Sequence, residues 1–195
     1  MRTAWGYDVD EMPPLLSKEK FHSMTGGIYM TNDRAESALL AASQAVRNYC
    51  GWHICPSVEC EAYPVGGAKI TRLPAGYVSS IESVFENGQE LTGGQYEWRH
   101  DGLLRRSQFK IWSYGWDSIK VDYYAGYDID AVPDLAEAVR AIAEGVLSVS
   151  AGVTSESADG VSISYSSSAA SIAAALTSSQ KAALAAYKVV SSHAA

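Results

Sequence analysis

The chain has 195 residues, of which 47% are hydrophobic and 19% are charged, and its formal net charge is −7. This composition argues for a packed interior and against global disorder. The acidic excess argues against tight binding along a nucleic-acid backbone, which requires clustered Lys and Arg. The N-terminus lacks a basic stretch followed by an apolar one, and no apolar run approaches the roughly 20 residues that span a bilayer. We therefore expect a soluble, cytosolic protein with no membrane association.

The first 30 residues predict an irregular arm followed by a short helix. Gly6 and the Pro13–Pro14 pair interrupt regular structure in the arm. Ser17 is a suitable N-cap for a helix over residues 17–24, and Thr25-Gly26-Gly27 ends it.

Residues 33–49 carry the clearest helical pattern of the chain. Asp33 and Glu36 have the spacing of a capping box, and Gly51 suits the position after the helix end. Small residues fill much of the helix, which favours close packing against a second helix, as in a bundle. From this helix and its exit, we expect these residues in the subunit core: Leu39, Val46, Tyr49 and Trp52.

Residues 57–125 change to short runs of alternating apolar and polar residues, separated by turn signals. Asn87-Gly88 between residues 78–86 and 89–91 is the strongest hairpin signal, because Asn-Gly suits a type I′ turn. Two further hairpins are predicted, 58–63 with 68–73 and 96–99 with 103–105. The alternation from Ile119 to Tyr124 predicts a half-buried strand.

A second long helix is predicted over residues 134–149, with Pro133 in its first turn. Its apolar stripe is expected to pack against the first long helix and to complete the core through Leu135, Val139, Ile142 and Val146. The fold class is therefore α+β, a small helical bundle with a β-rich insert at 57–125.

Residues 151–175 are rich in Ser, Ala and Gly and predict a flexible segment, with a possible strand at 161–165. Thr177 and Gln180 then form a full capping box for a final helix over about 178–190. Its apolar face is thin, so it would be marginal in water by itself and is expected to dock onto a partner. The residues expected at this docking surface are Gln180, Lys181, Leu184, Tyr187 and Lys188.

No catalytic motif is present in the sequence: there is no nucleophile elbow, no phosphate-binding loop and no metalloprotease motif. Cys50, His53, Cys55 and Cys60 lack the short Cys-x-x-Cys spacing of structural zinc sites, so we interpret the cysteines as buried or idle thiols. His53 follows a Trp directly and is interpreted as a structural hydrogen-bonding residue. We expect neither an enzyme nor a bound cofactor or metal.

Four segments of the chain carry motifs whose order is informative. Pro14-Leu15-Leu16-Ser17 opens the first predicted helix, and Ala41 to Ile54 ends the first long helix with a Cys-Gly-Trp-His exit. Tyr123 to Tyr127 lead to Val132-Pro133-Asp134-Leu135, and Leu176 to Gln180 are followed by Tyr187. In this order, the four segments resemble the opening helix, the first long helix, the strand-to-helix junction and the C-terminal helix of one family. It is the head–tail connector (adaptor, or head-completion) family of long-tailed bacteriophages, in the form found in phages of actinobacteria.

The resemblance implies a virion protein with three parts: arm and short helix 1–30, connector core 31–150, and flexible segment with docking helix 151–195. It implies a homo-oligomeric ring, usually a dodecamer, that binds the portal protein beneath the head and presents a platform for stopper and tail proteins. DNA would pass through the channel without specific binding, and the protein would be in the host cytoplasm during assembly and at the head–tail interface afterwards.

Three alternatives remain open on sequence grounds. One is a stopper or tail-completion protein, which shares small size and ring assembly. Another is a β-rich module that binds a saccharide or peptide through Trp98, Trp112 and Trp116. The third is a zinc or hydrolytic enzyme.

Overall fold

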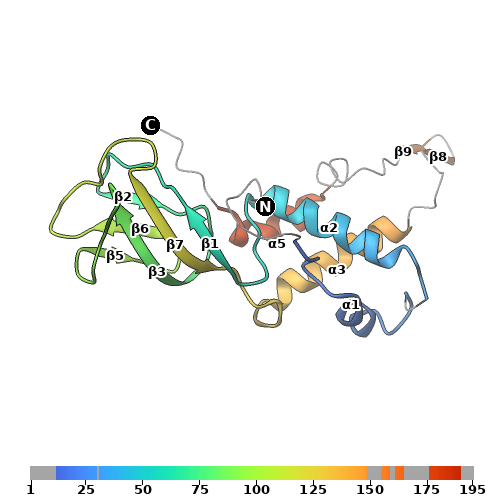
Figure 1. Cartoon of the computed structure of the whole chain (residues 1–195). Coiled ribbons are helices and arrows are strands. Elements are labelled where there is room, and N and C mark those ends of the chain that lie inside the picture. Colours follow the sequence, from blue (N-terminus) through green and yellow to red (C-terminus); the bar gives the residue numbers. More distant parts are fainter. Residues whose placement is uncertain (1–11, 30, 149–154, 159–160, 165–175, 190–195) are drawn as a thin grey trace. The chain divides into compact units, whose positions relative to one another are not determined.

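The computed structural model describes residues 12–29, 31–148, 155–158, 161–164 and 176–189 (Figure 1). The chain forms two compact units, which are treated separately below. The β unit contains Gly51–Asp128 together with residues 187–189, and the helical unit contains Pro13–Cys50 and the described part of Ile129–Ala186. The predicted α+β class is confirmed, and the strand-rich segment lies in sequence between the two long helices.

The helical unit is built on α2 (Ala35–Cys50) and α3 (Pro133–Ser148), which pack against each other as predicted. A short 3-10 helix, η1 (Ile129–Ala131), precedes α3. Helix α1 (Lys18–Met24) begins at the predicted cap, where the Ser17 hydroxyl accepts a hydrogen bond from the Lys20 amide. The unit is completed by α5 (Ser178–Leu184), which packs against both long helices.

The start of α2 differs from the prediction by two residues. The Asn32 side-chain oxygen accepts a hydrogen bond from the Arg34 amide at 2.9 Å, and the Asn32 carbonyl oxygen accepts one from the Ala35 amide at 3.0 Å. Asn32 therefore forms a turn immediately before α2, and the side-chain acceptor at this end of the helix is Asn32, whereas the sequence suggested Asp33. An Asn side chain supplies the same acceptor oxygen as Asp at this position.

Most of the predicted helical core is buried, namely Leu39, Val46, Leu135, Val139 and Ile142. Burying each such side chain contributes about 1.5–3 kcal/mol. Two predicted core residues, Tyr49 and Val146, are only half-buried. At the end of α3 the buried position is Leu147 instead.

The segment before α1 is irregular but is packed within the helical unit. Leu15 and Leu16 are buried, and the Leu15 amide donates a hydrogen bond to Ser43 Oγ at 2.8 Å. The Arg47 guanidinium donates to the Pro13 carbonyl oxygen, also at 2.8 Å. These bonds give the buried side chains of Ser43 and Arg47 hydrogen-bond partners. Without such partners, burial of these polar groups would destabilise the fold.

The β unit contains two antiparallel sheets (Figure 1). The first has the strand order β1-β7-β3-β4 and the second has the order β2-β6-β5. The strands are β1 (Val58–Ala62), β2 (Ile70–Arg72), β3 (Val78–Glu86), β4 (Gln89–Glu90), β5 (Tyr96–Trp98), β6 (Leu103–Arg106) and β7 (Ile119–Ala125).

Two of the three predicted hairpins are confirmed. Strand β3 pairs with β4 around Asn87-Gly88, whose φ angles of 52° and 77° are those that a type I′ turn requires. Strand β5 pairs with β6.

The predicted hairpin of residues 58–63 with 68–73 is wrong. Strand β1 pairs with β7 and strand β2 pairs with β6, so residues 63–69 carry the chain from one sheet to the other. Turn residues such as Pro64 and Gly66-Gly67 indicate a change of chain direction. The partner of each strand is decided by long-range packing.

The core of the β unit follows the alternation that the sequence predicted for β7. Ile119, Val121, Tyr123 and Ala125 are buried, whereas the residues between them are half-buried or exposed. Trp52, which was expected in the subunit core, is fully buried and lies in the β unit. A Cβ atom on Gly76 would lie 2.9 Å from its ring, so only glycine fits there without a shift.

Strands β8 (Ser155–Ala158) and β9 (Val161–Ser164) form an antiparallel pair, in agreement with the strand predicted at 161–165. The rest of the predicted flexible segment, like residues 1–11, lies outside the described residues. Within the described ranges, every helix falls short of the length and apolarity that a bilayer crossing requires.

Candidate functional site

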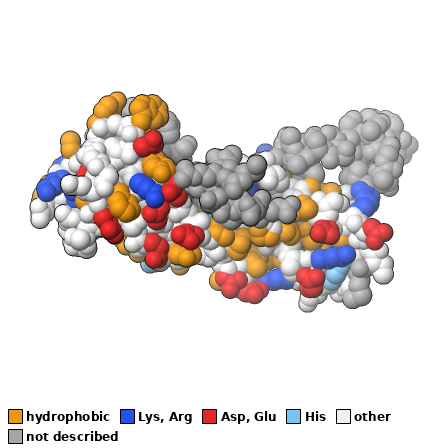
Figure 2. Space-filling view, in the orientation of Figure 1, with side chains coloured by type: hydrophobic (Ala, Val, Ile, Leu, Met, Phe, Trp, Pro, Cys, Tyr) orange, Lys and Arg blue, Asp and Glu red, His pale blue; other side chains and the backbone are white. Residues whose placement is uncertain are grey.

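The most exposed apolar surface of the β unit is the connection between β6 and β7, residues 107–118, here called the aromatic loop. Four of its five large hydrophobic side chains are exposed: Phe109 (88%), Ile111 (62%), Tyr114 (91%) and Trp116 (98%). Figure 2 shows hydrophobic side chains protruding from the surface of the β unit. Single exposed apolar residues are common, but a cluster of this kind marks an interaction site.

A buried tryptophan anchors the aromatic loop. Trp112 is fully buried in the middle of the exposed residues. Its amide donates to the Ala68 carbonyl oxygen at 2.8 Å, and its carbonyl oxygen accepts from the Gly67 amide at 2.9 Å. The loop is therefore paired through its backbone with the segment that joins β1 to β2.

The ion pair between Arg106 and Glu86 holds the base of the aromatic loop. The side chains of Arg106 and Glu86 are 9% and 11% exposed, and an Arg106 guanidinium nitrogen lies 3.0 Å from Glu86 Oε2. Glu86 Oε1 accepts a hydrogen bond from the Ser113 amide at 2.8 Å. Burial by itself would raise the pKa of Glu86, but the hydrogen bonds from Ser113 and the charge of Arg106 outweigh it and lower this pKa.

The turn at the end of the loop is held by Ser118. Its Oγ lies 2.8 Å from the Ser113 carbonyl oxygen and 3.0 Å from the Gly115 carbonyl oxygen, so the hydroxyl donates within the turn. Phe109 and Asp117 have positive φ angles of 60° and 54°, which side chains rarely adopt. Such backbone conformations persist only where the surroundings enforce them. The aromatic loop is thus a preorganised structure.

The surroundings of the aromatic loop are locally basic. Lys69 Nζ lies 5.7 Å from the centroid of the Phe109 ring, in the range of a cation–π contact. Lys110 is exposed between Phe109 and Ile111. The loop itself contains a single acidic residue, Asp117, so these two lysines give the region a local excess of positive charge in a chain of net charge −7.

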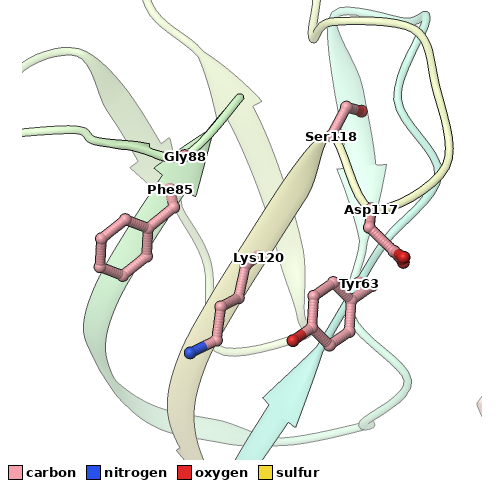
Figure 3. A pocket seen from close by; sticks show the side chains of 6 residues that line it. All are labelled: Tyr63, Phe85, Gly88, Asp117, Ser118 and Lys120. Carbon is pink, nitrogen blue, oxygen red and sulfur yellow. The ribbon is translucent and has the colours of Figure 1, made fainter.

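A small hollow of about 260 Å³ lies nearby, lined by Tyr63, Phe85, Gly88, Asp117, Ser118 and Lys120 (Figure 3). Lys120 Nζ is already paired with Glu61 at 3.0 Å and with Asp122 at 3.3 Å. The volume is below the ~300–1,000 Å³ of typical ligand pockets. The hollow does not bring together a nucleophile, a base and a group that orients the base.

The predicted docking helix begins as expected, with the reciprocal capping box of Thr177 and Gln180. Its two apolar docking residues, however, are buried inside the chain. Leu184 is covered within the helical unit, and Tyr187 lies in the β unit, with its ring edge-on to that of Tyr127 at 5.7 Å. A short amphipathic helix is stabilised by the nearest apolar surface, which here belongs to its own chain.

Of the five predicted docking residues, three keep access to solvent. Gln180 and Lys181 are half-buried and Lys188 is exposed. The carbonyl oxygen of Lys181 accepts a hydrogen bond from the Tyr49 hydroxyl at 3.2 Å. If α5 docks onto a partner, the contact is made by its polar residues Gln180 and Lys181 and not by Leu184.

The three cysteines and His53 are buried side chains within the fold. Cys50, Cys55 and Cys60 are buried and form no disulfide, and burial raises the pKa of Cys60 to about 12. His53 Nε2 lies 2.9 Å from the Ala125 carbonyl oxygen, and the His53 ring is edge-on to Trp52. Across the described residues, no three potential metal ligands come together.

The three tryptophans of the alternative binding module do not form one surface. Trp112 is buried and Trp116 is exposed, although they belong to the same loop. Trp98 is half-buried and packs edge-on against His100. The structure therefore removes Trp112 from that proposal.

The aromatic loop was not predicted from the sequence, although a signal was present. Residues 109–116 contain Phe, Ile, Tyr and two Trp without the regular alternation of a strand. Such a run beside turn residues is a candidate for a loop that presents aromatic side chains. Which of them point outward depends on the tertiary structure.

Comparison with known proteins finds similarity at the level of structure. No family model matches the chain, and no curated protein matches it. The chain is similar to a subunit in the neck of the native GTA (gene transfer agent) particle, computed with C12 symmetry, with a TM-score of 0.59 and 14% identity over 94% of both chains. It is also similar to one in the neck of the empty GTA particle, computed with C6 symmetry, with a TM-score of 0.54 and 16% identity, covering 94% of this chain and 95% of the other. The chain thus has the fold of neck subunits from a phage-like particle.

Proposed function

We propose that this chain is a structural subunit of the virion neck, a head–tail connector that forms a ring beneath the portal. In this role it extends the DNA channel and presents a platform for the stopper and tail proteins. The observation that carries the proposal is the fold similarity to GTA neck subunits, which covers 94% of each chain and so includes both units.

The chemistry of the chain supports the same role. A ring needs exposed apolar surface for contacts between proteins, and the aromatic loop supplies such a surface. A subunit of net charge −7, repeated around a channel, repels the DNA backbone and allows DNA to slide. The C12 symmetry reported for a similar neck supports a ring of twelve.

The test is to mix the purified chain with the portal protein of the same phage and to image the product by electron microscopy. We expect a twelve-fold ring of added density at the face of the portal that points toward the tail. The portal alone is the control. A portal that gains no density in the presence of excess chain would overturn the connector role. Binding only to isolated tails would instead favour a stopper or tail-completion protein.

We also propose that the polar side of α5, which carries Gln180 and Lys181, contributes to portal binding. Lys188 follows α5 in the β unit and stays a separate predicted docking residue. Lys181 is positively charged and keeps access to solvent in an otherwise acidic protein, which suits an acidic patch on a partner. Replacing Lys181 by Glu should weaken binding to portal rings about three-fold or more while the melting temperature stays unchanged. Equal binding by this variant and by the wild type would exclude this side of the helix.

A further inference from the structure

We propose that the aromatic loop of one subunit docks onto a second copy of this chain, on the exposed face of α2 around Leu40 and Glu36. The proposal rests on the proposed function, because it names the contact that would join neighbours in the ring. Four properties of the chain support it: the exposed apolar surface of the loop, its rigidity, its charge and the receiving face.

The first property is the amount and kind of apolar surface. Phe109, Ile111, Tyr114 and Trp116 are all largely exposed within eight residues. Val65, on the neighbouring segment, is also exposed. Tyr and Trp are the residues that most often dominate the binding energy of protein interfaces. Such a cluster in water is unfavourable unless another surface covers it.

The second property is that the loop is already ordered before it binds. The buried Trp112, the Arg106–Glu86 pair and the Ser118 hydroxyl hold its backbone at three places. The Tyr114 ring also lies close to the backbone of Gly67, where an added Cβ atom would come within 3.0 Å of it. A preorganised loop loses little conformational entropy on binding, so more of its contact energy appears as affinity.

The third property is charge, which selects the partner. Lys69 lies over the Phe109 ring and Lys110 is exposed between Phe109 and Ile111 in the sequence, whereas the whole chain is acidic. Two copies of an acidic protein repel each other on average, and a basic contact surface reverses the sign locally. A second copy is therefore a partner of complementary charge.

The fourth property is the receiving face. Helix α2 exposes Leu40 (45%), and Glu36, one turn earlier on the same side of the helix, is also exposed. Leu40 offers an apolar contact to the aromatic rings of the loop, and the Glu36 carboxylate offers an opposite charge to its lysines. Because loop and receiving face are different surfaces, the contact is heterologous, and a heterologous contact whose rotation closes produces a ring.

The first experiment measures self-association of the full chain by sedimentation velocity over a wide concentration range. We expect reversible oligomers for the wild type and association about thirty-fold weaker or more for Trp116→Ser and for Tyr114→Ser. Tyr124→Ser, which removes a partly exposed aromatic ring from β7, is the matched control and should associate normally. Melting temperatures should stay unchanged for the loop variants, because their side chains contact solvent.

The second experiment identifies the receiving face. Lys110→Glu and Glu36→Lys should each weaken association, and the double variant should recover most of the loss. A benzophenone amino acid at position 114 should, on irradiation, join two copies through a peptide of α2. Rising salt should weaken the wild-type contact, because screening acts on exposed charges.

A wild type that is monomeric at every concentration and gives no photo-crosslinked dimer would overturn the proposal. So would a probe that reacts only with another neck protein when that protein is added. Failure of the proposed function is separate: it would appear as no binding of the wild type to portal rings. Portal-bound rings that still form with Trp116→Ser would refute this contact and leave the connector role standing.

Discussion

The indole Nε1 of Trp52 donates a hydrogen bond to the backbone carbonyl oxygen of Tyr187, which lies 2.6 Å away. The two residues are 135 positions apart in the chain. The Tyr187 ring, placed edge-on to Tyr127, completes an aromatic cluster within the β unit. Tyr187 ends the 3-10 helix η2 (Ala185–Tyr187), which follows α5. It is therefore part of the β core, although the sequence predicted it on a docking surface.

Tyr187→Ala should destabilise the β unit by about 2–4 kcal/mol, because it removes a buried aromatic ring and leaves a cavity beside Tyr127. The free energy of unfolding is measured by urea denaturation followed by tryptophan fluorescence. The control is Ala186→Ser at the preceding exposed position, which should change stability by less than ~0.5 kcal/mol. Equal stability of Tyr187→Ala and the wild type would show that the ring is not part of the core in solution.

Gly126→Ala should destabilise the chain by at least about 2 kcal/mol. Gly126 has a φ of 116°, and an added Cβ would lie 2.3 Å from the Pro56 carbonyl oxygen and 2.7 Å from His53 Nε2. The matched control is Gly93→Ala, where no heavy atom lies within 4 Å of the added Cβ. Thermal melting compares the two variants, and a normal melting temperature for Gly126→Ala would contradict the packing described at this turn.

The Glu86–Arg106 pair predicts a specific dependence of stability on pH. The pKa of Glu86 in the folded chain is below its ordinary value of 4.5. A carboxyl group of this kind contributes stability above its unfolded pKa, and this contribution is lost as the pH falls through the lower, folded pKa. The free energy of unfolding should therefore fall more steeply on acidification below about pH 4.5 in the wild type than in Glu86→Gln.

At neutral pH, Glu86→Gln should cost about 1–3 kcal/mol, because the nearly buried Arg106 guanidinium loses its counter-charge. Glu90→Gln, at an exposed position of β4, is the control for removal of a negative charge nearby. Identical acid-unfolding curves for the wild type and Glu86→Gln would show that this pair does not stabilise the base of the aromatic loop.

Val46→Asp or Ile142→Asp should unfold the helical unit, because each places a carboxylate between α2 and α3 without a partner. Asn48→Asp introduces the same group on the exposed side of α2, where the Gln44 amide can still donate to it. We expect little change in stability for this control. The measurement is helical circular dichroism during thermal unfolding, and native-like melting of Val46→Asp would disprove the packing of the two helices.

Local sequence signals predicted the elements whose determinants lie within a few residues. The caps at Ser17 and Thr177 and the Asn87-Gly88 turn act through short-range hydrogen bonds and allowed backbone angles. The alternation in β7 and the apolar stripes of α2 and α3 also follow from the periodicity of the elements themselves.

The pairing of β1 with β7 and of β2 with β6 was beyond this kind of reasoning. Many strand pairings satisfy the same local alternation, and the folded chain selects those that bury one common core. The burial of Trp112 and the exposure of Trp116, four residues apart, could not be predicted from the sequence either. Both are tryptophans with the same intrinsic preference for burial, so only the packing of distant segments distinguishes them.

The sequence by itself determined the α+β class, the two long helices, the insertion of the strands between them and the capped final helix. Each of these depends on interactions between neighbours along the chain, which a sequence displays directly. Only the tertiary structure decided that Leu184 and Tyr187 are buried in their own chain and that the aromatic loop carries the exposed apolar surface. The reason is physical: burial depends on which distant segments meet, and the free energy of covering an apolar side chain is the same whichever surface covers it.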